Sequence, residues 1–118
     1  MYKLCIIEPD GRYTSLFAGQ PLRFIKGNDP YTKLEYKVGE VTTAPDGSHG
    51  VFCSIIKPQA QVDILREPGK EYMLALFEVE QAGRELIPSY AHNCFNCTSI
   101  RVTKRLWRDT DKRKRRVA

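Results

Sequence analysis

Short runs of alternating hydrophobic and polar residues, separated by Pro and Gly, make up most of the chain. Because side chains alternate between the two faces of a strand, such runs predict β-strands. Pro9-Asp10-Gly11 combines a fixed φ with a residue that tolerates positive φ, and it predicts a hairpin between the first two strands. Segment 72–80 is the most regular and is expected near the centre of the sheet. The expected strands are residues 2–7, 12–17, 34–38, 50–56 and 72–80, with a last strand around 100–102 and an edge strand or turn at 22–25.

One segment has the pattern of a short helix. Pro58 suits the first helical position, apolar residues follow at Val62, Ile64 and Leu65, and Pro68-Gly69 then ends the segment. Short connections join all these elements. Together they predict the α+β class, with a mostly antiparallel sheet of five to seven strands and one short helix.

The length of 118 residues, with 42% hydrophobic and 28% charged residues, fits one globular domain. A chain of this size buries roughly two-thirds of its unfolded surface, so we expect it to fold without a metal, a disulfide or a cofactor. Its apolar runs are shorter than the roughly 18 residues of a membrane span, and Glu8, Pro9 and Asp10 follow directly on the apolar start. We therefore expect a cytoplasmic protein with no signal peptide, no membrane association and four reduced cysteines.

The net charge of +5 is distributed unevenly. Residues 1–100 hold 10 basic and 12 acidic residues, a net charge of −2, whereas residues 101–118 hold 9 basic and 2 acidic residues, a net charge of +7. This division predicts a near-neutral domain at 1–108 with a basic arm at 109–118, rather than a domain with a basic face. Any affinity for phosphate backbones is expected in the arm and not in the body, because residues 1–100 carry a net charge of −2 and repel a polyanion. The candidate nucleic-acid-binding residues are Arg105, Trp107, Arg108, Lys112, Arg113, Lys114, Arg115 and Arg116.

Aromatic residues leave two interpretations open. Trp107 stands between arginines, which suits stacking on a base, but an indole after the last strand also suits a cap on the core. Tyr13, Tyr31, Tyr36 and Tyr90 fall near predicted turns or strand ends, where a base could stack or where a phenol could cover the edge of the core.

Cys94 and Cys97 have the spacing of half a tetrahedral zinc site, but the sequence contains no second pair of this kind. We therefore expect ordinary thiols and no bound metal. Redox activity of the same pair requires a helix N-terminus, whereas a loop is predicted here. Glu78 and Glu80 share one face of a strand and have the residue type for acid–base work, as does any solvated strand end. No catalytic set converges, so we expect a non-enzymatic protein.

The two histidines stand in two predicted connections, at residues 47–50 and 88–96, each of which leads into a strand. Recognition residues concentrate on loops that a rigid sheet holds in place. We predict a ligand-binding site where both loops meet at one end of the sheet. Its candidate residues are His49, Tyr90, His92 and Phe95.

Four short patterns resemble a group of small proteins found in bacteriophages and bacteria. They are Tyr-Lys-Val-Gly-Glu at residues 36–40, Gly-Val-Phe at 50–52, Glu-Val-Glu at 78–80 and the terminal strand at 99–102, so the resemblance covers most of residues 1–106. It implies a phage or bacterial setting, with the host cytoplasm as location, and carries no activity over to this chain. Compact accessory proteins of this kind typically act by binding.

Three classes of function follow, in order of preference. The first is a small accessory protein that recognises a host or phage protein or a nucleotide. The second is a nucleic-acid-associated or assembly component that uses its basic arm, and the third is a small nucleotide-processing enzyme. The sequence does not determine the oligomeric state.

Overall fold

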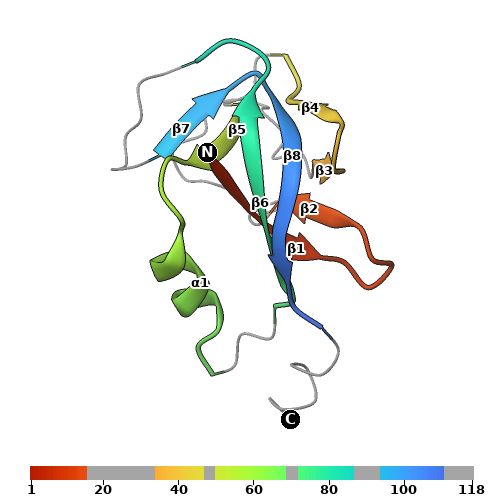
Figure 1. Ribbon diagram of the computed structural model, residues 1–118, viewed down its shortest axis with the longest axis vertical. Helices are drawn as coiled ribbons and strands as arrows, with labels where there is room; N and C mark the ends of the chain where they lie inside the picture. The colour runs from red at the N-terminus through yellow and green to blue at the C-terminus, as the bar shows by residue number, and fades with distance from the viewer. Residues whose placement is uncertain (16–33, 47–49, 69–71, 87–93, 111–118) are drawn as a thin grey trace.

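The computed structural model describes residues 1–15, 34–46, 50–68, 72–86 and 94–110. Within these residues it contains eight strands and one short helix (Figure 1). The predicted α+β class with a mostly antiparallel sheet is therefore confirmed, with one strand more than the upper limit expected. The elements are β1 (Tyr2–Ile7), β2 (Tyr13–Ser15), β3 (Glu35–Tyr36), β4 (Val41–Thr43), β5 (Val51–Ser54), α1 (Gln59–Leu65), β6 (Leu74–Gln81), β7 (Cys94–Cys97) and β8 (Ser99–Arg108).

The main path of the sheet has the order β3-β2-β1-β6-β8-β4, while β5 pairs with β1 and β7 off this path. β3 and β4 stand at opposite ends of the order but follow one another in the chain. The Thr42 hydroxyl, on β4, donates to the backbone carbonyl of Glu35, on β3, at 2.8 Å. The sheet therefore curls until its two ends meet, as in a small barrel. β6 lies between β1 and β8, which confirms its predicted central position.

The inner face of the curled sheet encloses the larger core. Alternate residues of the central strands point inward, so that Cys5 of β1 and Phe77 of β6 are fully buried. Tyr13 of β2 packs its ring edge-on against Phe77, with the ring centroids 4.9 Å apart. The residues buried in this inner core are Cys5, Tyr36, Ala44, Val51, Cys53, Ala75, Phe77, Val79, Cys97, Ile100 and Val102.

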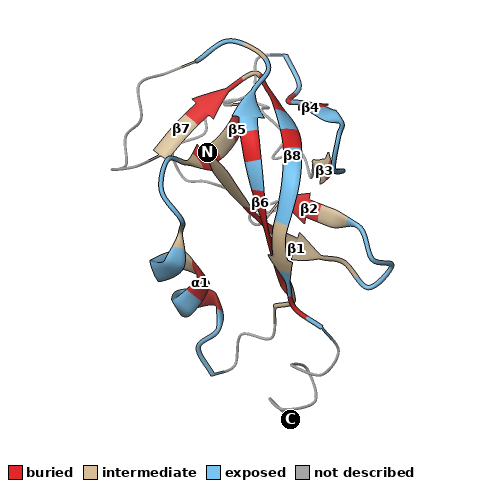
Figure 2. Ribbon diagram, viewed as in Figure 1, coloured by how far each residue is buried: buried red, intermediate tan, exposed pale blue. Residues whose placement is uncertain are grey.

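A second core lies on the outer face, between β1, β6 and α1. Val62 and Leu65 of the helix are buried with Leu4, Leu74 and Leu76 of the strands. Figure 2 shows the buried stripe of α1 on the side that faces the sheet. A helix of seven residues has little stability of its own, so this packing holds it in place. In the described part of the chain, no helix is long and apolar enough to cross a membrane.

Several predicted elements differ in extent from those observed. β4 and β7 were not predicted as strands, because they are short and their pattern is weak; β4 forms against β8, and β7 forms against β5. The strand expected at 50–56 ends at Ser54, and Ile55 and Ile56 are each 53% exposed. The strand expected at 12–17 is observed over Tyr13–Ser15, and the segment 22–25 lies outside the described residues.

Candidate functional site

β8 is the longest strand and carries four exposed basic residues: Arg101, Lys104, Arg105 and Arg108. Its pairing with β6 extends from Gln81↔Ile100 to Ala75↔Arg108, with two irregularities on the way. These basic residues therefore belong to the sheet. The predicted domain of residues 1–108 already included them, although the charge count that divided the chain after residue 100 assigned their charge to the C-terminal part. Residues 1–110 hold 14 basic and 13 acidic residues, so the body is close to neutral.

The basic residues on the two faces of β8 have different neighbours on β6. Glu78↔Lys104 and Glu80↔Arg101 are register pairs, so each of these cations stands opposite a carboxylate. Arg101 and Glu80 form an ion pair, with Nε and Oε1 3.5 Å apart. The positive charge on this face of β8 is therefore offset by β6.

The other face of β8 holds Arg105 and Arg108, which pair in register with Phe77 and Ala75. Their guanidinium groups converge on one phenol: Nη1 of each arginine donates to the hydroxyl oxygen of Tyr13 at 3.1 Å. The Arg108 guanidinium carbon also lies 5.7 Å from the centroid of the Tyr13 ring. We call these three residues the Tyr13 cluster.

The Tyr13 cluster carries two positive charges around a neutral acceptor. Within the described residues neither of its guanidinium groups forms an ion pair with a carboxylate. The sequence indicated Arg105 and Arg108 as candidate nucleic-acid-binding residues and Tyr13 as a candidate for stacking on a base. It did not indicate the cluster, because 92 and 95 positions separate Tyr13 from the two arginines.

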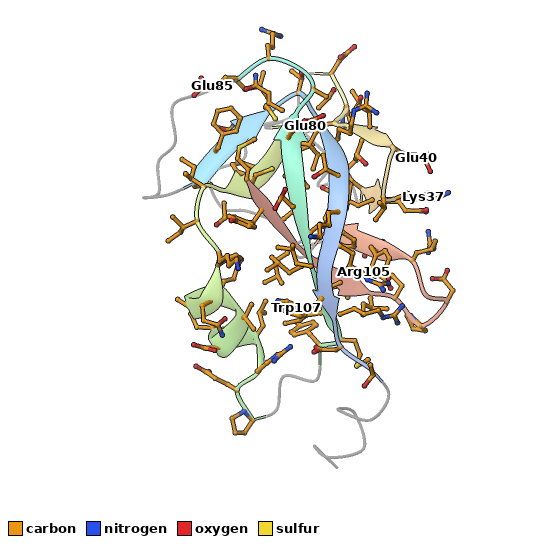
Figure 3. All side chains as sticks on the ribbon, in the orientation of Figure 1. Lys37, Glu40, Glu80, Glu85, Arg105 and Trp107 are labelled. Atoms are coloured by element: carbon orange, nitrogen blue, oxygen red, sulfur yellow. The ribbon has the colours of Figure 1, made fainter. Side chains whose placement is uncertain are left out.

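Trp107 lies on the opposite face of β8 from Arg105, as Figure 3 shows. It pairs with Leu76, packs against the second core, and its ring lies 5.1 Å from the guanidinium carbon of Arg66. Of the two interpretations of this indole, the structure supports the one in which it covers the core. The last five candidates of the basic arm, residues 112–116, lie outside the described residues.

Of the predicted loop site, only Phe95 lies within the described residues; His49, Tyr90 and His92 lie outside them. Phe95 belongs to β7 instead of a loop, and it is partly buried against the inner core. The described residues next to the two connections do meet: a Cβ atom added to Gly50 would lie 2.5 Å from Cδ1 of Leu86.

The cysteines do not form the half zinc site that their spacing suggested. Cys94 and Cys97 stand three positions apart on β7, so their side chains point to opposite faces of the strand. Burial raises the pKa of the Cys5 thiol to about 12 and that of Cys53 to about 11, against the nearby positive charge of Lys3. The Lys3 ammonium donates to the backbone carbonyl of Phe52 at 2.6 Å. A group of three or more metal-ligating side chains is not found among the described residues.

The two carboxylates considered for acid–base work are both exposed on β6. Glu80 is ion-paired with Arg101, and Glu78 stands opposite Lys104. Both glutamates are therefore solvent-exposed side chains that stand opposite basic residues, as on any solvated strand.

Comparison of the chain with protein-family models, with curated proteins and with solved structures finds no match.

Proposed function

We propose that this protein binds nucleic acid, with the Tyr13 cluster on the body and the basic arm as the contacting parts. The observation that carries the proposal is the convergence of Arg105 and Arg108 on the Tyr13 hydroxyl without a carboxylate partner among the described residues. Arginine recognises phosphate through its planar set of N–H donors, and most protein–nucleic acid contacts are to phosphate.

The charge pattern of β8 favours the Tyr13 cluster over the rest of the strand. Arg101 and Lys104 stand opposite two glutamates, so a phosphate placed there would also meet carboxylates. Arg105 and Arg108 stand opposite Phe77 and Ala75, which carry no charge. The body is near neutral overall, so attraction to a polyanion is concentrated at the cluster and in the arm.

The position of the arm supports the same conclusion. Asp109 directly follows Arg108 and is bonded to the body, through Arg66 and through the backbone N–H of Leu74. The chain therefore leaves the body next to the Tyr13 cluster. Five consecutive basic residues, Lys112 to Arg116, follow within a few positions, and their composition extends the contact along a phosphate backbone.

The test compares two double variants of equal charge change by fluorescence anisotropy on a labelled oligonucleotide. R105A/R108A removes both cations of the Tyr13 cluster, and R101A/K104A removes two cations from the opposite face of the same strand. We expect R105A/R108A to weaken binding about 10- to 100-fold, and the control by less than about threefold. On duplex DNA the salt slope should change from about −6, for seven phosphate contacts, to about −4.5. Equal losses in both variants, or no loss in either, would contradict the proposal.

The proposal concerns one of the two binding classes expected from the sequence. Recognition of a host protein or a nucleotide by His49, Tyr90 and His92 stays a prediction, as does the phage or bacterial setting.

A further inference from the structure

We infer that the Tyr13 cluster is a site for a terminal phosphate, a phosphate monoester at the end of a nucleic acid strand. This rests on the proposed function and specifies which part of the nucleic acid the cluster takes. The observations are the two guanidinium groups that share one phenol oxygen and the donors that they retain.

The donors of the cluster are arranged around one point. A phenol oxygen has two lone pairs, and both are occupied by the Nη1 donors of Arg105 and Arg108, each at 3.1 Å. The hydroxyl proton of Tyr13 is then available to an outside acceptor. Each guanidinium group has five N–H donors, and Arg105 uses one of them on the Tyr13 oxygen. Arg108 uses two, one on the Tyr13 oxygen and one on the backbone carbonyl of Asp109 at 3.3 Å. Most of the guanidinium donors are therefore available to the same ligand.

The charge of the cluster selects the type of phosphate. Two guanidinium groups held beside one neutral oxygen repel each other, and an anion of charge −2 offsets both. A phosphate monoester carries about −1.5 to −2 at pH 7, whereas an internal phosphodiester carries −1. A monoester also presents three terminal oxygens, which equals the number of donor groups in the cluster. The cluster therefore matches a strand end better than the middle of a strand.

The core holds the cluster in place before any ligand arrives. The Tyr13 ring is packed edge-on against Phe77, which is fully buried, so its hydroxyl has a fixed position. Ala75, which pairs in register with Arg108, is also fully buried, so the core fixes the strand position beside the cluster. A preorganised set of donors loses less conformational entropy on binding.

The experiment measures the affinity of the full chain for three single-stranded oligonucleotides of one sequence, with a 5′-phosphate, with a 3′-phosphate or with hydroxyls at both ends. We expect one or both phosphorylated forms to bind about 5- to 20-fold more tightly than the unphosphorylated form. R105A/R108A should remove this preference, Y13F should reduce it, and R101A/K104A should retain it. Circular dichroism melting curves confirm that each variant is folded.

The outcomes separate the inference from the proposed function. Equal affinity of the wild-type chain for all three oligonucleotides overturns the terminal-phosphate site, and a loss of affinity in R105A/R108A alone would then leave the proposed function standing. A preference that survives in R105A/R108A also overturns the site, because it places terminal recognition elsewhere. Absence of binding to all three single-stranded oligonucleotides overturns the terminal-phosphate site, and absence of binding to duplex DNA as well overturns the proposed function. The comparison in the wild-type chain requires no variant, so a variant that fails to fold does not prevent the test.

Discussion

Replacing Asp109 with alanine should destabilise the body, because its carboxylate joins three elements. Asp109 is 7% exposed; its Oδ1 accepts a hydrogen bond from Nη2 of Arg66 at 2.5 Å, and its Oδ2 accepts one from the backbone N–H of Leu74 at 2.9 Å. Its own backbone N–H donates to the Leu74 carbonyl at 2.8 Å. The carboxylate thus connects the end of α1, the start of β6 and the end of β8.

The magnitude follows from what D109A leaves behind. The backbone N–H of Leu74, a residue with no exposure, loses its carboxylate acceptor, and an unsatisfied buried donor costs about 1–3 kcal/mol. The Arg66 side chain is 34% exposed and can be rehydrated, so the lost ion pair adds only about 1 kcal/mol. The expected loss is about 2–4 kcal/mol, which corresponds to a melting temperature lower by roughly 10–20 °C.

Urea denaturation and thermal melting of D109A, R66A and the double variant measure this loss and the coupling between the two side chains. D109N is the matched control, because its amide oxygen can still accept from Leu74 while its charge is lost, and it should cost less than D109A. R66A should cost less in the D109A background than alone, because the buried carboxylate is then already gone. A cost of D109A below about 0.5 kcal/mol, with equal costs of R66A in both backgrounds, would refute the reasoning.

Three further predictions concern the thiols and one glycine. Cys94 should be the first thiol alkylated in the folded chain at pH 8, because burial raises the pKa of Cys5 to about 12 and of Cys53 to about 11. Mass spectrometry identifies the modified residue, and equally fast modification of Cys5 would contradict this prediction. The free energy of unfolding should fall by about 3 kcal/mol between pH 8 and pH 10, because the unfolded chain releases these two protons near pH 9 and the folded chain retains them. Urea titrations should give a flatter pH curve for C5A/C53A, and an unchanged slope would exclude this cause. Gly50→Ala should lower the free energy of unfolding by about 2–4 kcal/mol in the same assay, because φ is +84° and the new Cβ atom would lie 2.5 Å from a carbonyl oxygen of β7. Gly39→Ala is the control: φ is +86° but the space is open, so the loss should be only about 1 kcal/mol. Equal losses in the two variants would show that the close approach at Gly50 is unimportant.

The sequence alone determined the elements whose pattern is local. The β-branched and aromatic residues of β1 predicted a strand, and the regular alternation over 72–80 predicted a strand near the centre of the sheet, where β6 lies. Pro58 and the apolar residues before Pro68 predicted the short helix. These features depend on residues that are close in the chain, and the physical rules for them act over the same distance.

Only the tertiary structure decided the strands that form through their partners. β4 and β7 have three and four residues, and they become strands because β8 and β5 offer backbone groups to pair with. Pairing with β6 also extends the last strand to Arg108, whereas the local pattern indicated a strand only around residues 100–102.

The candidate site was decided in the same way. Composition indicated Arg105 and Arg108 as phosphate ligands, but it also indicated Trp107, which packs against the second core, and it gave no reason to place Tyr13 with them. β1 and β6 separate β2 from β8 in the sheet order, and Tyr13 reaches the arginines across the inner face because the sheet curls. Register between strands is set by contacts across the whole chain, so the meeting of these three side chains exists only in the folded protein.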